Sequence, residues 1–184
     1  MKNFQFSIFN FQKSGGFTLV ETIVAIGVIS VGFVGSLVLL SKSASQASTL
    51  KDRLIVAHLA EEGIEVVRNL RDTNWLKGFD WRAGLDDTSF ALVNYNSTAI
   101  DTNGNVSGRE CLNYGGFYVH PTVVSSCNTS FKRHIEITTK DDPDLIDPNT
   151  GKKAQYMEVK SIVSWREKVS TKSLTVIDNL YDWK

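Results

Sequence analysis

Residues 22–41 form an uninterrupted run of twenty uncharged residues, and this run constrains the fold more than any other feature. Twenty residues in a helix span the hydrocarbon layer of a bilayer. Glycine, alanine and serine interrupt its aliphatic side chains. Small residues let neighbouring membrane helices pack closely, although glycine is also common in membrane helices in general. We therefore predict a membrane helix that packs against other helices.

The order of the candidate cleavage site and the apolar run does not fit a secretory signal. Such a signal has its cleavage site after the apolar stretch, whereas the glycine pair Gly15-Gly16 comes before it. We predict that a leader, residues 1–16, is removed and that the apolar run stays in the mature protein. Glu21 lies inside the predicted helix, and a carboxylate at membrane depth is costly enough to be a functional candidate.

The sequence Gly16-Phe17-Thr18-Leu19-Val20-Glu21, placed ahead of an apolar run, resembles the N-terminal motif of type IV prepilins and pseudopilins. The resemblance implies that a membrane aspartyl peptidase cuts after Gly16 and that the new amino terminus, Phe17, is N-methylated. It also implies that Glu21 helps the subunit to enter a growing filament. In an apolar filament core, pairing of the freed amine with this carboxylate would offset part of the free-energy cost of burying each charge. The alternative is a signal-anchored protein in which Glu21 has no role.

Weaker similarities point to a class within this family. Residues 60–72, 163–168 and 180–183 look like minor pilins of the type IV pilus modification class. Val38 stands where many major pilins have a helix-kinking proline, which favours a minor pilin or a pseudopilin. The resemblance implies a non-enzymatic subunit that helps to initiate or modify a type IV pilus. The alternatives are a type II secretion pseudopilin and an adhesive or DNA-binding tip subunit.

The resemblance also implies the partners and the location. The partners are other pilin or pseudopilin subunits, the prepilin peptidase and methyltransferase, and an inner-membrane assembly platform. The chain would cross the inner membrane once before it enters a pilus or pseudopilus, and its two cysteines favour a C-terminal part outside the cytoplasm.

Apolar residues continue at helical spacing beyond the uncharged run. This pattern predicts one helix over residues 17–72, with residues 17–41 in membrane or filament core and residues 42–72 packed on a domain. Glu65, Arg68 and Asp72 have the spacing of ion pairs along it. The predicted buried stripe is Leu50, Leu54, Ala57, Ala60, Ile64, Val67 and Leu70.

The remaining part, residues 73–184, carries the alternation of antiparallel strands with one buried face. Together with the helix it predicts an α+β fold. Candidate strands cover residues 89–94 and 117–124, and residues 141–153 read as a loop with two prolines. The predicted inward side chains are Phe131, Ile135, Ile137, Met157, Val159, Val163, Trp165, Leu174, Val176 and Leu180.

Cys111 and Cys127 are the two cysteines of the chain. In an exported domain they predict a disulfide, with free buried thiols as the alternative. Their spacing does not fit a metal site, and we expect no cofactor.

A calcium loop is a weak alternative for one polar segment. The oxygen-bearing residues Asp101, Asn103, Asn105, Ser107 and Glu110 follow its spacing in part. The segment lacks two features of the EF-hand, because Val106 replaces the required glycine and Leu112 replaces the bidentate glutamate. A polar turn is the better interpretation.

Neither catalysis nor nucleic-acid binding is indicated. The three histidines are scattered and no nucleophile motif accompanies them, so we predict no enzyme. The basic clusters, residues 132–134 and 152–153, are short and lack an aromatic platform, and we interpret them as solvated surface. The formal net charge of zero agrees with this interpretation.

Overall fold

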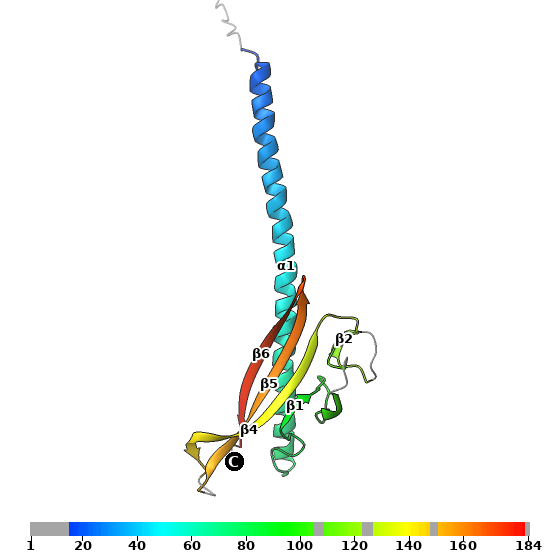
Figure 1. Ribbon diagram of the computed structural model, residues 1–184, viewed down its shortest axis with the longest axis vertical. Helices are drawn as coiled ribbons and strands as arrows, with labels where there is room; N and C mark the ends of the chain where they lie inside the picture. The colour runs from blue at the N-terminus through cyan, green and yellow to red at the C-terminus, as the bar shows by residue number, and fades with distance from the viewer. Residues whose placement is uncertain (1–14, 105–108, 123–126, 148–150, 183–184) are drawn as a thin grey trace, which may run out of the picture. The chain divides into compact units, whose positions relative to one another are not determined.

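The computed structural model describes residues 15–104, 109–122, 127–147 and 151–182 (Figure 1). The chain divides into two compact units, Met1–Ala47 and Ser48–Lys184. Helix α1 (Leu19–Leu76) contributes to both. Residues 1–14 of the predicted leader lie outside the described residues.

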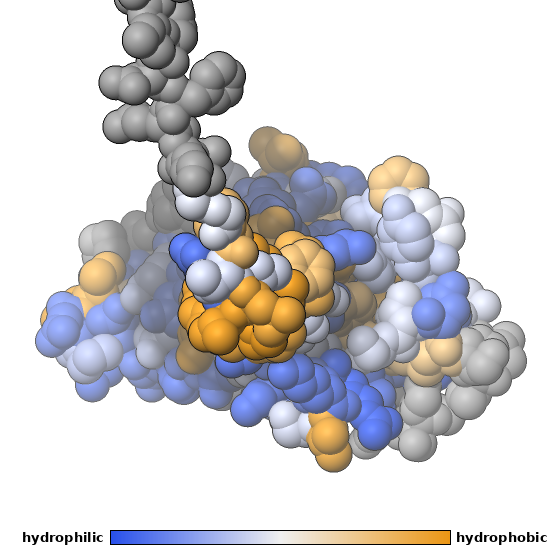
Figure 2. Space-filling view, turned by 90° about the horizontal axis from the view of Figure 1, so that it is seen from above, coloured by the Kyte–Doolittle hydropathy of each residue, from blue (hydrophilic) through white to orange (hydrophobic). Residues whose placement is uncertain are grey.

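The first unit is the apolar beginning of α1. Every described residue from 15 to 47 is exposed, including large aliphatic and aromatic side chains. Figure 2 shows this apolar part of the helix as a strongly hydrophobic surface. α1 is the described helix that is long and apolar enough to cross a membrane. The hydroxyls of Ser30 and Ser36 donate to the carbonyls of Ile26 and Gly32, at 2.7 and 2.9 Å, so these polar groups are satisfied within the helix.

The second unit is a four-stranded antiparallel sheet with the later part of α1 on one face. The strand order is β1 (Thr88–Ala91), β4 (Lys132–Ile146), β5 (Lys153–Glu167) and β6 (Ser170–Tyr181). A short 3₁₀ helix, η1 (Thr102–Gly104), and a small hairpin of β2 (Asn113–Tyr114) and β3 (Tyr118–Val119) lie between β1 and β4 in sequence. The predicted α+β fold is confirmed.

The helix ends after Leu76, where Gly78 adopts a φ of 76° and stops the chain from continuing as a helix.

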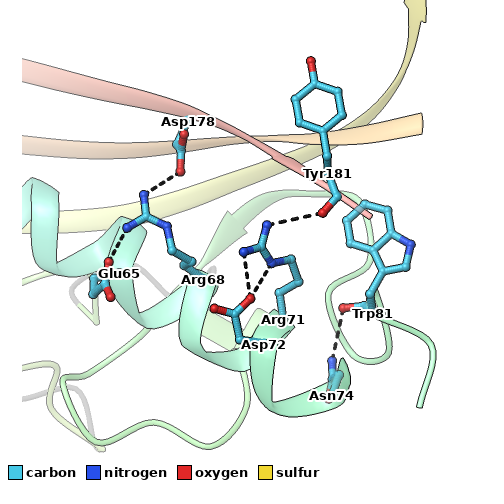
Figure 3. Close-up of polar contacts among 8 residues, drawn as sticks. All are labelled: Glu65, Arg68, Arg71, Asp72, Asn74, Trp81, Asp178 and Tyr181. Carbon is cyan, nitrogen blue, oxygen red and sulfur yellow. Dashed lines mark hydrogen bonds and ion pairs between the residues drawn. The ribbon is translucent and has the colours of Figure 1, made fainter. Parts of the chain in front are cut away.

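Near this end, Arg68 forms ion pairs with both Glu65 and Asp178, the latter at 2.9 Å across to β6 (Figure 3). The predicted Arg68–Asp72 pair does not form, because Asp72 pairs with Arg71 at 2.7 Å. Arg71 also donates to the carbonyl of Tyr181 at 3.3 Å. Polar contacts therefore fix the end of α1 to the last strand.

The core lies between α1 and the sheet. The inward positions predicted for β4 and β5 are confirmed, as is most of the helix stripe. Leu50 and Leu54 are exceptions, because they are 65% and 60% exposed, and Ala57 is only half-buried. The part of α1 that packs on the sheet lies after Leu54. Its buried residues are Val56, Leu59, Ala60, Gly63, Ile64, Val66, Val67, Leu70 and Arg71.

Arg133 is the largest fully buried side chain of the domain, so its prediction as solvated surface is wrong. It points inward from β4 and donates to the carbonyls of Leu59 and Val93, at 2.8 and 2.7 Å. Its guanidinium also pairs with Glu62 at 2.9 Å. A buried cation with these partners is tolerated because its charge and most of its donors are satisfied. Arg133 thereby joins α1, β4 and the segment after β1.

The predicted loop over residues 141–153 is strand at both of its ends, because β4 continues to Ile146 and β5 begins at Lys153. Pro143 falls in the irregular stretch between Asp141 and Ile146, where a missing N–H costs no ladder bond. The carboxylate of Asp142 accepts from the N–H groups of Asp144 and Leu145, at 2.9 and 3.1 Å, and from the Tyr181 hydroxyl at 2.9 Å.

Strands near the middle of the chain are shorter than predicted. The candidate over residues 89–94 corresponds to β1, which is four residues long. The candidate over residues 117–124 is a strand only at Tyr118 and Val119, and residues 123–126 lie outside the described part of the chain.

Candidate functional site

The start of α1 carries the residues that sequence analysis singled out for processing and assembly. Residues 15–18 precede the helix and are exposed, with Phe17 83% accessible. A side-chain carbon added at Gly16 would meet no atom within 4 Å. The peptide bond between Gly16 and Phe17 therefore lies in exposed chain outside the helix, where a peptidase can reach it.

Thr18 caps the helix, a role that sequence analysis missed. Its hydroxyl oxygen accepts a hydrogen bond from the Glu21 N–H at 3.2 Å, and its carbonyl accepts from the Thr22 N–H at 3.1 Å. Threonine followed three residues later by glutamate is the pattern of a capping box, which could have revealed this helix start. The helix thus begins two residues after Phe17.

Glu21 lies in the first turn of α1, where the partial positive charge of the helix N-terminus favours a carboxylate. Its side chain is exposed and has no ion-pair partner among the described residues. It is therefore available to a cation supplied from outside the described chain, such as a free amino terminus.

Cys111 and Cys127 form a disulfide, with Cα atoms 6.0 Å apart. Cys111 is buried and makes an isolated bridge to Lys132, at the start of β4. The disulfide thus closes a loop around the small β2–β3 hairpin, and Cys111 holds one end of that loop against the main sheet.

The carboxylates of the candidate calcium loop are engaged in ion pairs. Asp101 pairs with Arg109 at 2.5 Å, and Glu110 pairs with Lys132 at 2.7 Å. Asp101 also accepts from the Asn103 N–H at 3.0 Å, as in a polar turn. Asn105 and Ser107 lie outside the described residues. Within the described ranges, no group of three metal-binding side chains comes together.

The three histidines lie apart. His58 is on the exposed face of α1, and His134 stacks on Phe90 with ring centroids 5.2 Å apart. His120 is buried, and its Nδ1 lies 3.1 Å from the carbonyl of Arg109. Burial, together with the nearby Arg133 cation, lowers the pKa of His120 from 6.5 to about 4. A buried neutral histidine of this kind is a structural group rather than a proton donor at neutral pH.

Comparison with protein families finds one match, to the model described as the prokaryotic N-terminal methylation motif, over residues 11–37. The chain carries a type IV prepilin-like motif. This motif and the long apolar helix support a type IV pilin or pseudopilin, a kind of structural protein that is generally non-enzymatic. The motif implies processing by a prepilin peptidase and assembly with other pilin subunits, and it fits a single-pass membrane anchor. No curated protein and no solved structure matches the chain.

Proposed function

We propose that this protein is a minor pilin that helps to initiate or modify a type IV pilus after cleavage between Gly16 and Phe17. The observation that carries the proposal is the start of α1. An accessible glycine–phenylalanine bond is followed within two residues by a capped helix with a long apolar surface, and Glu21 in its first turn has no ion-pair partner among the described residues.

Cleavage would place a cation next to this carboxylate. The new amino group of Phe17, N-methylated, stays positively charged at neutral pH. In a filament core, the pairing of this amine with Glu21 of the same or a neighbouring subunit favours one axial register. Glu21 is thus an assembly contact and not a catalytic group.

The unbroken helix α1 favours a minor pilin over a major pilin. The helix runs without a break through Val38, the position at which many major pilins carry a kinking proline. A type II secretion pseudopilin is the second candidate, because an unkinked helix fits it equally well. Genes for pilus retraction beside this one would support the first candidate, and an outer-membrane secretin with secretion partners would support the second.

The Cys111–Cys127 bond supports export of the C-terminal unit, because disulfides persist in oxidising compartments. We therefore place this unit outside the cytoplasm, with the chain held in the inner membrane until assembly.

N-terminal mass determination of the native protein tests the proposal. We expect a mature chain that begins at an N-methylated Phe17. The variant Gly16→Ala should keep its leader, and this effect belongs to the peptidase because the added methyl group has free space in the chain. A Gly16→Ala protein that still begins at Phe17 would overturn the assignment of the cleavage site.

A further inference from the structure

The Cys111–Cys127 disulfide lines a pocket of about 260 Å³ in the second unit. Lys132 of β4 and Arg166 of β5 line the same pocket, together with serine and threonine residues. None of the described residues that line it carries a carboxylate. A small molecule that enters this pocket therefore meets the disulfide with two cations beside it.

The two cysteines differ in their access to solvent. Cys111 is buried and bridged to Lys132, whereas Cys127 is exposed. A thiolate opens a disulfide by attack on one of its sulfur atoms, and the rate depends on access to that atom. Attack from the pocket therefore falls on Cys127, and Cys111 is the leaving group.

Charge in the pocket favours an anionic reagent. Arg166 has no ion-pair partner among the described residues, since the neighbouring Glu167 pairs with Arg53 at 3.3 Å. Lys132 is paired with Glu110 at 2.7 Å, so Arg166 supplies the uncompensated charge. A cation in a cleft raises the local concentration of an anion and stabilises a thiolate beside it.

Asn128 holds the chain next to Cys127 by hydrogen bonds that do not involve the disulfide. Its Oδ1 accepts from the Tyr114 N–H at 2.8 Å, and its Nδ2 donates to the Tyr114 carbonyl at 3.0 Å. Its own N–H donates to the Asn113 side chain at 2.9 Å. These bonds would keep Cys127 close to Cys111 after the disulfide opens, so that the bond re-forms readily.

We propose that Cys127 is a site of reversible exchange with small anionic thiols. The thiolate of the reagent attacks Cys127 Sγ and forms a mixed disulfide there. The Cys111–Cys127 bond breaks with its electron pair on Cys111 Sγ, which takes a proton from water. Attack of the Cys111 thiolate on Cys127 Sγ later expels the reagent thiolate and restores the bond. The exchange goes beyond the proposed pilin function and does not depend on it.

The test uses the full chain in detergent and two small thiols, anionic mercaptoethanesulfonate and cationic cysteamine, each in large excess. Acid quenching and mass spectrometry give the initial rate at which the disulfide opens, divided by the thiolate concentration. We expect the anionic thiolate to react faster. Arg166→Gln should slow it about fivefold at low salt, the effect of one unit charge about 4 Å away in water, and should not slow the cationic one. Arg82→Gln removes the same charge from the turn after α1 and should change neither rate.

Peptide mapping of the quenched protein locates the adduct, which we expect on Cys127. Asn128→Ala should raise the fraction that carries the adduct, because the disulfide re-forms more slowly, whereas Asn96→Ala, at an exposed turn, should not. The proposal would be overturned by an adduct on Cys111, by no adduct at all, or by a ratio of the two rates that Arg166→Gln leaves unchanged. Equal adduct fractions in the two asparagine variants would overturn the holding role of Asn128. None of these results depends on leader cleavage or filament entry, so the pilin proposal is tested separately.

Discussion

Gly63 lies at a close approach between α1 and the sheet. A side-chain carbon there would lie 2.5 Å from Ser161 Oγ and 2.9 Å from Ile135 Cδ1. The glycine weakens the isolated helix by about 1 kcal/mol relative to alanine, but it permits the contact on which the core depends. Its role is therefore close packing rather than bending.

Gly63→Ala should lower the free energy of unfolding by about 1–3 kcal/mol, because overpacking outweighs the gain in helix propensity. Denaturation of the full chain in detergent measures this change. Adding Ser161→Ala removes the nearest atom and should restore part of the loss. Gly27→Ala is the matched control, since a methyl group there meets nothing within 4 Å. A Gly63→Ala protein as stable as the Gly27→Ala protein would contradict the packing role.

Glu21→Ala should leave the protein processed but poorly incorporated into filaments, because the carboxylate that we propose to pair with the new amine is lost. Glu21→Gln keeps the shape of the side chain but removes its charge, and this variant should also be poorly incorporated. Glu61→Ala removes an exposed carboxylate further along α1 and should be incorporated normally. Immunoblots of membranes measure leader removal, and immunoblots of sheared filaments measure incorporation. Normal incorporation of Glu21→Gln would refute the charge-pair account.

At the scale of elements, the segment between β1 and β4 depends on few regular hydrogen bonds. β2 and β3 are two residues each, and β1 is four. The Cys111–Cys127 disulfide and the hydrogen bond from the His120 N–H to the Asn94 side chain, at 2.7 Å, cross-link this segment internally, and Arg133 of β4 ties it to the sheet through the Val93 carbonyl. Side-chain contacts thus replace a strand ladder.

The Cys111–Cys127 bond should contribute about 3 kcal/mol to the free energy of unfolding, by the chain-entropy estimate for a loop of this size. Unfolding in detergent with and without reductant measures the difference. The protein with both cysteines changed to serine should be insensitive to reductant. Protein isolated without reductant should show no titratable thiols after denaturation, and two thiols at that stage would exclude the bond.

At the scale of the whole molecule, acid should destabilise the domain through His120. The folded protein holds this side chain neutral, with a pKa of about 4, whereas the unfolded chain takes up a proton near pH 6.5. The stability should therefore be complete above pH 6.5 and fall by about 3 kcal/mol as the pH drops from 6.5 to 4.

Denaturation curves across this pH range measure the effect. His120→Gln should flatten the dependence between pH 4 and 6.5 even if the variant is less stable at every pH. His58→Gln, which changes an exposed histidine, should keep the wild-type slope. An unchanged slope in His120→Gln would assign the acid sensitivity to other groups.

The sequence by itself determined the helix, the sheet and the processing segment. Uncharged residues over a membrane length, helical spacing and strand alternation are local periodicities, and the residues from Gly16 to Glu21 lie within one short motif. Tertiary structure decided what depends on partners distant in the chain. Arg133 is buried because Glu62 and two carbonyls meet it from other segments. Gly63 is needed because Ser161 lies against it. The periodicity of a single sequence does not reveal such contacts, because they form only when separate elements pack.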